Sequence, residues 1–301
     1  MYDLIIIGSG PAGMAAAIYA KRACLDVLVI ERSGFSGGQV LNTYEVDNYP
    51  GLPGISGFDL AQKMNEHAVK LGAQIKEDEI VEITEEAGVY KLVGEKETYE
   101  TKGVVLATGA KHAHLNVPGE EELCGMGVSY CATCDGAFFA GRDVAVVGGG
   151  DVAVEDAIFL ARSCRKVYLI HRRDELRAAK SLQESLKQYN NVEILWNTTV
   201  EEIVGEDAVT SLTIQNKMTG ERSALPVNGI FVAVGILPNS EFIGDFVEKD
   251  AAGYIVAGED ARTNRKRVYA VGDVRTKPLR QVVTAVADGA NAITSYQKDI
   301  L

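Results

Sequence analysis

The chain has 301 residues, a length typical of about two domains. Hydrophobic residues make up 47% and charged residues 24%, so the chain can bury a sizeable core. Its 30 basic and 42 acidic residues give a net charge of −12, which argues against nucleic-acid binding, because that binding depends on clustered Lys and Arg. No apolar run approaches the roughly 20 residues of a membrane span, and the N-terminus lacks the basic start of a signal peptide. We therefore expect a soluble cytoplasmic protein that binds neither nucleic acid nor membrane.

The N-terminal segment predicts a dinucleotide-binding unit. The apolar run Leu4–Ile7 has the pattern of a strand buried on both faces of a parallel sheet, and the glycine-rich turn Gly8–Gly13 follows it. In the spacing G-x-G-x-x-G, the first glycine allows a tight turn and the second lets a pyrophosphate approach. The third lets the following helix pack on the strand. Glu31 ends the next apolar run, where a carboxylate can accept hydrogen bonds from ribose hydroxyls. The candidate cofactor-binding residues here are Gly8, Gly10, Pro11, Ala12, Gly13 and Glu31.

The same order of strand, glycine turn, helix and strand occurs a second time. The apolar run Val144–Val147 leads into the turn Gly148–Ala153, whose last position is an alanine that the spacing tolerates. At the place that corresponds to Glu31 this copy has His171, followed by arginines. Guanidinium groups bind a 2′-phosphate through charge-assisted hydrogen bonds, whereas a carboxylate would repel it, so this unit predicts NADPH binding. The alternative is that the arginines form a solvated basic face. The candidates are Gly148, Gly150, Ala153, His171, Arg172, Arg173 and Arg177.

Both units close on a similar apolar run that ends in glycine, at 104–109 and at 230–235. Between the glycine turn and this closing run, each unit has a region of alternating polar and apolar residues, at 73–102 and at 192–228. Such alternation is typical of small antiparallel meanders. The sequence thus predicts an α/β fold of two Rossmann-like dinucleotide-binding domains, each with a small antiparallel β meander.

A third segment is too short to be a domain of its own. It contains an apolar run at 268–273 and a helical stretch at 281–296, which we expect to add a last strand and helix to one of the two sheets. Prolines near 115–118 and 238–242 mark the expected crossings between the domains. The acidic stretches 76–79 and 119–122 predict solvated loops.

The sequence Cys131-Ala132-Thr133-Cys134-Asp135 predicts a redox site. A C-x-x-C motif in a cytosolic chain near a strand–helix–strand unit is typical of a redox-active pair. Zinc is the alternative, but it needs two further ligands with their own spacing, and the other cysteines and the four histidines do not supply them, so we expect no metal. Asp135 is either the acid that protonates a leaving thiolate or an ordinary turn residue. We expect the remaining cysteines to be small buried residues: Cys24, Cys124 and Cys164.

Together these motifs resemble those of bacterial-type, low-molecular-weight thioredoxin reductases. The resemblance covers essentially the whole chain. The matching segments are 8–13, 37–39, 45–51, 107–109, 131–136, 148–150, 171–173 with Arg177, and 272–273 with 280–281.

The resemblance implies FAD in the first site and NADPH in the second. Residues 1–114 and 243–301 would form a discontinuous FAD-binding domain, and residues 115–242 an NADP-binding domain that carries the cysteine pair. In the second site, Asp151 stands where the family often has an asparagine. The additional flavin contacts that the resemblance implies are Gly37, Gly38, Gln39, Asn48, Thr108, Gly109, Gly272, Asp273, Arg280, Gln281 and Val282.

The resemblance also implies a role for each redox residue. Cys134 would be the sulfur next to the flavin, Cys131 the sulfur that attacks the protein substrate, and Asp135 the acid. Such enzymes are homodimers whose NADP domain swings relative to the FAD domain. The function that follows is that of a thioredoxin-disulfide reductase, which passes electrons from NADPH through FAD and the cysteine pair to a thioredoxin.

Three other functions are alternatives to this one. The electrons could pass to another thioredoxin-fold protein or to a peroxidase. Enzymes of this fold that take electrons from ferredoxin lack the NADP motif, whereas the glycine turn and the arginines are intact here, which disfavours that function. In a non-catalytic nucleotide sensor, the cysteine pair would be a redox switch or a metal site.

Overall fold

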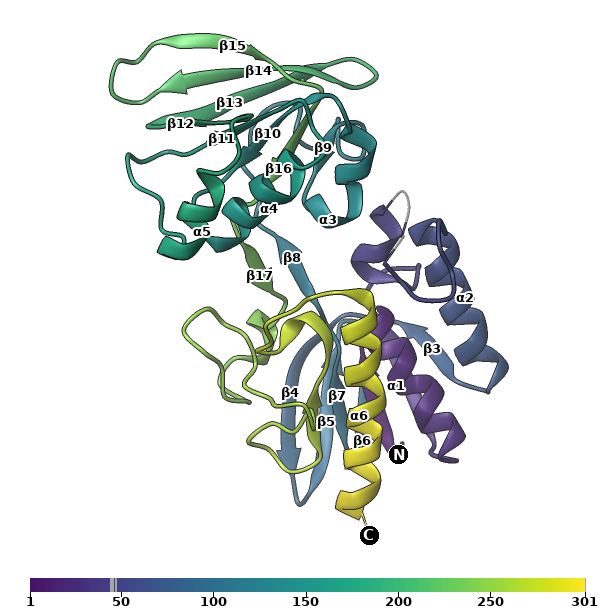
Figure 1. Cartoon of the computed structure of the whole chain (residues 1–301). Coiled ribbons are helices and arrows are strands. Elements are labelled where there is room, and N and C mark those ends of the chain that lie inside the picture. The colour runs from purple at the N-terminus through teal and green to yellow at the C-terminus, as the bar shows by residue number, and fades with distance from the viewer. Residues whose placement is uncertain (44–45, 47, 301) are drawn as a thin grey trace. The chain divides into compact units, whose positions relative to one another are not determined.

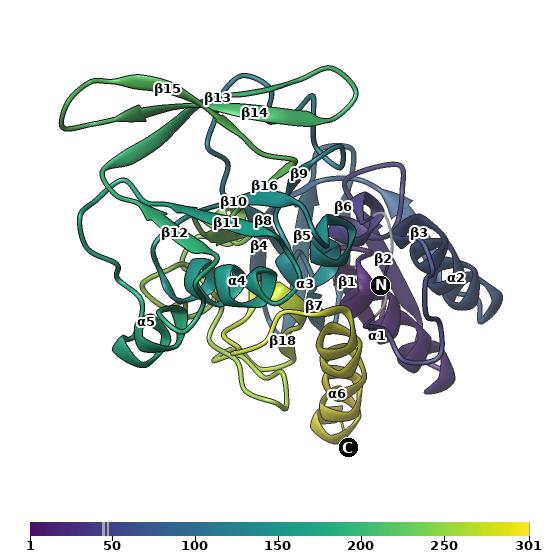
Figure 2. The same ribbon diagram turned by 45° about the horizontal axis from the view of Figure 1, so that its top comes forward.

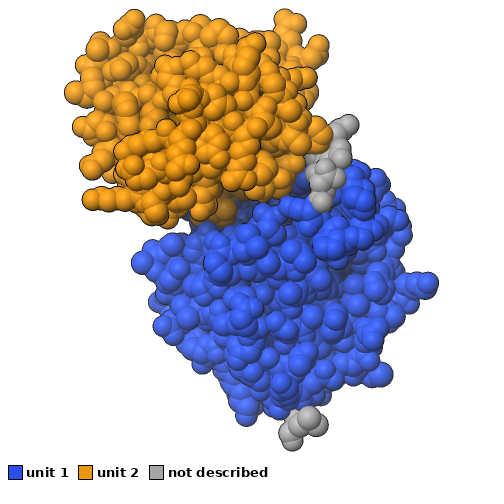
Figure 3. Space-filling model, viewed as in Figure 1, with its two compact units in different colours: residues 1–111, 237–301 blue, residues 112–236 orange. Residues whose placement is uncertain are grey.

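The computed structural model describes residues 1–43, 46 and 48–300. The chain forms two compact units, which Figure 3 shows in different colours: Met1–Lys111 with Leu237–Leu301, and His112–Ile236. The changeovers lie a few residues before the crossings expected near 115–118 and 238–242. Of the motif at 45–51, Glu45 and Asp47 lie outside the described residues. Among the helices that the structure describes, none has both the length and the apolar character that a membrane span requires.

A five-stranded, all-parallel sheet forms the centre of the first unit (Figure 2). In its middle strand β1 (Leu4–Ile7) all four side chains are buried, because both faces of the sheet are covered. The strand order is β18-β7-β1-β2-β3, so the third segment of the sequence joins this sheet as strand β18. The other strands are β2 (Val27–Glu31), β3 (Gln74–Glu77), β7 (Val104–Leu106) and β18 (Val268–Ala270).

Helices α1 (Pro11–Arg22) and α6 (Val282–Ile300) cover one face of this sheet. They run side by side, as both Figure 1 and Figure 2 show. The two helices approach closely at Gly289, where a Cβ atom would lie 2.3 Å from the carbonyl oxygen of Ala12. Helix α2 (Gly57–Lys70) packs beside α1. The apolar helix faces and alternate side chains of the strands form one continuous core.

An antiparallel sheet of three strands covers the other face of this parallel sheet. It consists of β4 (Ile80–Glu86), β5 (Val89–Gly94) and β6 (Thr98–Thr101). The meander expected at 73–102 is therefore correct for its last three strands and wrong for its first, since β3 pairs in parallel with β2. Strand β3 is the edge of the parallel sheet and is largely polar, so its sequence resembles that of a meander strand.

The acidic stretch at 76–79, expected as a solvated loop, contains a buried carboxylate. Asp78 is 2% exposed and accepts hydrogen bonds from three backbone N–H groups and from the Tyr99 hydroxyl. Burial alone would raise the pKa of Asp78, but these hydrogen bonds hold it below its usual value. The carboxylate thus ties the end of β3 to the antiparallel sheet.

The second unit repeats the layers of the first. Helices α4 (Asp151–Ala161) and α5 (Lys180–Leu186) lie on one face of a parallel sheet of order β12-β11-β10-β16-β9. The antiparallel sheet β13-β14-β15 lies on the other face. The meander expected at 192–228 again includes one strand too many, because β12 pairs in parallel with β11. The strands are β9 (Val128–Ser129), β10 (Asp143–Val147), β11 (Lys166–Ile170), β12 (Val192–Leu195), β13 (Thr198–Gly205), β14 (Val209–Asn216), β15 (Arg222–Pro226) and β16 (Gly229–Val232). Two short strands at the changeovers, β8 (Ala110–His112) and β17 (Ile236–Pro238), pair with each other.

Candidate active site

The first glycine turn has the geometry that a dinucleotide site requires. Gly8 has a φ of +102°, and a Cβ atom there would lie 2.4 Å from the carbonyl oxygen of Ala107. A Cβ atom at Gly13 would lie 1.9 Å from the Gly8 carbonyl oxygen, so neither position accepts a side chain. At Gly10 the nearest atom, apart from those of adjoining residues, is the Gly37 carbonyl oxygen at 4.0 Å, which leaves room at the N-terminus of α1. A helix N-terminus of this kind attracts an anion such as a pyrophosphate.

Glu31 lies beside this turn and is held by two serines. Ser9 donates to Oε2 from its backbone N–H (2.8 Å) and its hydroxyl (2.6 Å), and Ser33 donates to Oε1 from the same two groups (3.1 Å each). Four donors match the roughly four lone-pair positions of a carboxylate. A further hydroxyl donor to Glu31 would have to replace one of these four donors. Sequence reasoning missed both serines, although Ser9 stands inside the glycine motif.

The segment Gly37–Gln39 lies against the same turn. The Gly37 N–H donates to the Ser9 carbonyl oxygen at 3.0 Å, and both glycines have positive φ values of +140° and +59°. Gln39 belongs to the 3-10 helix η1 (Gly38–Asn42), and its side-chain amide donates to the Ala110 carbonyl oxygen. Three predicted flavin residues thus lie at the first glycine turn and at the start of β8.

Two further pairs bring distant parts of the sequence together in the first unit. Asn48 donates from Nδ2 to the Gln281 Oε1 atom at 2.9 Å. Thr108 donates from its hydroxyl to the Asn239 carbonyl oxygen (2.7 Å), and the Asn239 side chain donates back to the Thr108 carbonyl oxygen (2.9 Å). Gly109 follows with a φ of +68°. Asn239 was not identified from the sequence, because its partner lies far away in the chain.

The Gly272–Asp273 turn comes from the C-terminal part of the chain to the N-terminus of α1. It lies in the 3-10 helix η4 (Gly272–Val274), and a Cβ atom at Gly272 would lie 2.9 Å from the Ala12 Cβ atom. The Asp273 Oδ1 and Arg280 Nε atoms are buried and have no hydrogen-bond partner among the described residues. Buried polar groups in folded proteins nearly always have a partner. These two atoms therefore fit a polar cofactor such as FAD, and Val282 begins α6 close by.

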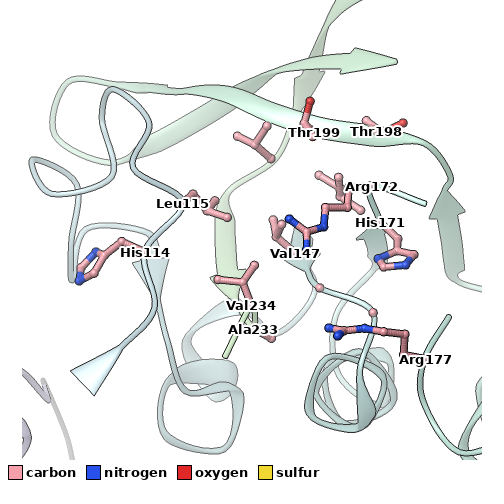
Figure 4. Close-up of a pocket in the computed structure, with 14 residues that line it drawn as sticks. His114, Leu115, Val147, His171, Arg172, Arg177, Thr198, Thr199, Ala233 and Val234 are labelled. Atoms are coloured by element: carbon pink, nitrogen blue, oxygen red, sulfur yellow. The ribbon is translucent and has the colours of Figure 1, made fainter. Parts of the chain in front are cut away.

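The second glycine turn lines a pocket of about 330 Å³ (Figure 4). A Cβ atom at Gly148 would lie 2.5 Å from the Ala153 Cβ atom and 2.5 Å from the Ala233 carbonyl oxygen, whereas a Cβ atom at Gly150 would meet open space. Of the predicted residues, Gly148, His171, Arg172 and Arg177 line the pocket. Four others that the structure also describes do not: Gly150, Asp151, Ala153 and Arg173. Lining residues that sequence reasoning missed include His114, Leu115, Thr198, Thr199, Val200 and Val234.

The arginines gather at one end of this pocket. Figure 4 shows Arg172 and Arg177 beside His171, with Leu115 and His114 at the opposite end. Two guanidinium groups near a glycine turn fit the 2′-phosphate of NADPH.

A set of hydrogen bonds holds Arg177 in place. Its backbone N–H donates to the Gly149 carbonyl oxygen (2.7 Å), and Asp151 Oδ1 accepts from the N–H of Ala179 (2.7 Å). The His171 ring fills the space at Gly149, where a Cβ atom would lie 2.1 Å from it. Burial lowers the pKa of His171, so the ring is neutral at pH 7 and shapes the turn rather than adding positive charge.

The cysteine pair forms a disulfide in the second unit. Cys131 and Cys134 are half-buried, with Cα atoms 5.3 Å apart, at the start and within helix α3 (Ala132–Asp135). Strand β9 ends just before them, and the Cys131 N–H donates to the Ser129 hydroxyl at 3.1 Å. A disulfide is what the C-x-x-C motif of a redox pair forms on oxidation.

Asp135 lies next to this disulfide in a half-buried position. The Ser129 hydroxyl donates to its Oδ2 atom at 2.6 Å. Burial raises the pKa of Asp135 above the usual value, although this hydrogen bond opposes part of the effect by favouring the carboxylate. A carboxyl group that keeps its proton to a higher pH suits an acid that protonates a leaving thiolate.

A hydrogen-bond network around Glu120, just before Cys131, was not predicted from the sequence. Glu120 was expected in a solvated acidic loop but is 2% exposed, and it accepts hydrogen bonds from the N–H groups of Leu115 and Asn116 and from the Tyr130 hydroxyl (2.9, 2.7 and 2.9 Å). The expectation is correct for Glu121 and Glu122, which are exposed in a turn, and wrong for Glu120, because its carboxylate satisfies backbone groups of the chain that enters the unit. The network fixes the residue that precedes Cys131.

The remaining cysteines were expected to be buried, and two of them are not. Cys164 is buried, whereas Cys24 and Cys124 are exposed. Cys24 follows helix α1 with a φ of +58°, and Cys124 forms an isolated β-bridge with Val128. The expectation failed for both because they belong to connecting segments at the surface, which the amino-acid type alone does not reveal.

Comparison with known proteins identifies the family. A family model described as pyridine nucleotide-disulphide oxidoreductase matches residues 2–289. A thioredoxin reductase of Listeria innocua is 47% identical, over 99% of this chain and 93% of that protein. The chain belongs to the thioredoxin reductase family. The resemblance drawn from the motifs is thereby confirmed, and the chain is an oxidoreductase.

Solved structures of thioredoxin reductases confirm the fold class. That of the Streptococcus pyogenes enzyme has a TM-score of 0.93 and 44% identity, covering 100% of this chain and 98% of the other. A ferredoxin-flavin thioredoxin reductase of Clostridium acetobutylicum is more distant, with a TM-score of 0.53 and 31% identity over 99% of this chain and 97% of its own. The expected α/β architecture with two dinucleotide-binding domains is that of the family.

Proposed function

We propose that this chain passes two electrons from NADPH through FAD to the Cys131–Cys134 disulfide, and from the resulting dithiol to a thioredoxin. The observation that carries the proposal is the disulfide itself, which lies in the same unit as a glycine-turn pocket lined by Arg172 and Arg177. The related proteins are thioredoxin reductases, which supports thioredoxin as the protein substrate.

Residues of the first unit would hold FAD. The helix α1 N-terminus would bind the pyrophosphate beside Gly10, Glu31 would accept a ribose hydroxyl, and the unpartnered atoms of Asp273 and Arg280 would contact the cofactor. FAD, when bound, supplies the two-electron redox centre between the nicotinamide and the disulfide.

The second unit would bind NADPH and carry out the disulfide chemistry. Arg172 and Arg177 would bind the 2′-phosphate. Two electrons and two protons convert the disulfide to a dithiol. The Cys131 thiolate would then attack the disulfide of the partner, and the displaced partner thiolate would take a proton from Asp135. Attack by Cys134 on the mixed disulfide would release the reduced partner and restore the disulfide of this chain.

The proposal includes the assembly and the location of the protein. The FAD-binding domain would comprise residues 1–114 and 243–301, and the NADP-binding domain residues 115–242, in a cytoplasmic homodimer. Another thioredoxin-fold protein or a peroxidase is the alternative partner for the same electron path. Comparing turnover across the thioredoxin-like proteins of the source organism distinguishes these partners.

The direct test is the colour and turnover of the purified protein. We expect a yellow protein that contains FAD and reduces a thioredoxin with NADPH, and much less efficiently with NADH. Absorbance near the flavin bands and NADPH consumption coupled to a thioredoxin are the measurements. A colourless protein that cannot be reconstituted with FAD would refute the proposal.

The raised pKa of Asp135 leads to a prediction for pH dependence. As an acid Asp135 works in its protonated form, so the rate of dithiol–disulfide exchange should fall as the pH rises through its pKa. Ser129→Ala removes a hydrogen bond that favours the carboxylate, which raises the pKa of Asp135 further and moves this falling limb to higher pH. Ser129→Thr, which keeps a hydroxyl, is the control.

Rapid mixing of the reduced protein with an oxidised thioredoxin, over a range of pH, measures this effect. Asp135→Asn should lower the exchange rate about 100-fold, which is within the usual range for a general acid. It should also abolish the fall of the rate with rising pH. If the exchange rate of Asp135→Asn still falls with rising pH as in the wild type, another group supplies the proton.

A further inference from the structure

A buried ion cluster lies directly behind the Gly272–Asp273 turn. Asp288 of α6 is 2% exposed, and its carboxylate accepts a hydrogen bond from the Gly272 N–H at 2.9 Å. It also accepts hydrogen bonds from Arg275 (Nε at 2.9 Å, Nη2 at 2.7 Å) and from the Lys277 Nζ atom (2.7 Å). One side chain of α6 thus holds the turn and the segment that follows it.

The cluster has two buried cations and one buried anion. The side chains of Arg275 and Lys277 are each 3% exposed. Glu259 lies 3.2 Å from Arg275, but its side chain is 86% exposed, so solvent screens its charge. Burial alone would raise the pKa of Asp288, but the hydrogen bonds from Arg275 and Lys277 hold it below its usual value, so Asp288 is ionised at neutral pH.

Asp288 lies where three parts of the first unit meet. Its neighbour Gly289 is the point at which α6 approaches the Ala12 carbonyl oxygen, and Gly272 packs against the Ala12 Cβ atom. The N-terminus of α1, the turn and the Asp288 carboxylate therefore meet at one place. A shift of the turn would also move Asp273, whose Oδ1 atom has no partner among the described residues.

We propose that Asp288 is a positioning residue for FAD: by binding the Gly272 N–H, Arg275 and Lys277, it fixes the turn that presents Asp273 to the cofactor. The inference rests on the proposed binding of FAD to the first unit. Asp288 acts through the turn and not by direct contact with FAD, because its carboxylate oxygens are used by the turn and the two cations.

The test is the FAD affinity of Asp288→Asn, which keeps the shape of the side chain but removes its charge and one acceptor. We expect the dissociation constant for FAD to rise about tenfold or more, because the turn loses a charge-assisted hydrogen bond and FAD binding must then supply the free energy of ordering it. Dilution of the purified flavoprotein, followed by the fluorescence of released FAD, measures the constant.

Asp299→Asn is the matched control. Asp299 lies near the other end of α6 and also pairs with an arginine, accepting from Arg262 Nε (3.1 Å) and Nη2 (2.8 Å). Its removal should lower the unfolding temperature but leave the FAD dissociation constant unchanged. An equal rise in both variants would show that Asp288 acts only on stability and would overturn the proposal.

A second variant separates geometry from charge. Asp288→Asn leaves two buried cations without a counter-charge, which destabilises the fold. The double variant Asp288→Leu with Lys277→Met restores the net charge of the cluster and leaves the Gly272 N–H without its acceptor, so it should still show the raised dissociation constant. Wild-type affinity in the folded double variant would overturn the inference alone, whereas a wild-type protein without affinity for FAD would refute the proposed function and this inference together.

Discussion

Replacing either Cys131 or Cys134 by serine should abolish NADPH-dependent reduction of a thioredoxin. A serine hydroxyl can neither form a disulfide nor act as the attacking thiolate, so each variant lacks one of the two sulfurs that exchange requires. The rate of thioredoxin reduction should fall by several orders of magnitude. Reduction of the flavin by NADPH should persist in both variants, since that step precedes the disulfide.

Anaerobic titration with NADPH, followed by turnover with a thioredoxin, measures both steps in each variant. The two variants should differ in their spectra, because Cys134 is the sulfur proposed to lie next to the flavin. Cys131→Ser should therefore retain any long-wavelength charge-transfer band, and Cys134→Ser should lose it. Cys124→Ser, which removes an exposed free thiol, is the control and should leave turnover intact. Normal turnover in Cys131→Ser would mean that the electrons leave the protein by another route.

Arg172→Ala and Arg177→Ala should each weaken the binding of NADPH. Both side chains line the pocket at the second glycine turn, and each lost charge-assisted contact to the 2′-phosphate weakens binding by about 1.5–3 kcal/mol, or roughly 10- to 100-fold. NADH lacks this phosphate, so its Michaelis constant should change little, and the preference between the two nucleotides should fall by the same factor.

Arg173→Ala supplies the comparison within the same arginine cluster. The sequence alone places Arg173 and Arg172 equally near the phosphate, but only Arg172 lines the pocket. Steady-state kinetics with both nucleotides should therefore show a smaller effect for Arg173→Ala than for Arg172→Ala or Arg177→Ala. If Arg173→Ala has the largest effect, the phosphate binds outside the pocket described here.

The sequence predicted those parts of the fold and the site that local constraints determine. Gly8, Gly13 and Gly148 stand where any side chain would collide with the backbone or a neighbouring residue, so their spacing is visible in the sequence itself. The same holds for the cysteine pair, whose separation of three residues decides that a disulfide can form. Parallel strands of the interior were equally clear, because burial on both faces demands continuous apolar runs.

What could not be predicted depends on partners that are distant in the sequence. Strands β3 and β12 are short edge strands, and only their neighbours show that they belong to the parallel sheets. Asp288 resembles a solvent-exposed acid in the sequence, yet it is buried because the N–H of Gly272 and the cations of Arg275 and Lys277, in other elements, satisfy it. No local pattern distinguishes such a carboxylate from a solvated one.

The return of the C-terminal segment to the first sheet has a consequence for protein synthesis. Residues 112–236 are one uninterrupted stretch, so the second unit can fold as soon as it has left the ribosome. The first unit folds later, because β18 and α6 are made after residues 112–236. Until then its parallel sheet lacks the edge strand β18, and its helix layer lacks α6. The Gly8–Gly13 turn, proposed to bind FAD, is therefore completed only when Gly272, Asp273 and Asp288 have been made. The unit that starts first along the chain should finish folding last.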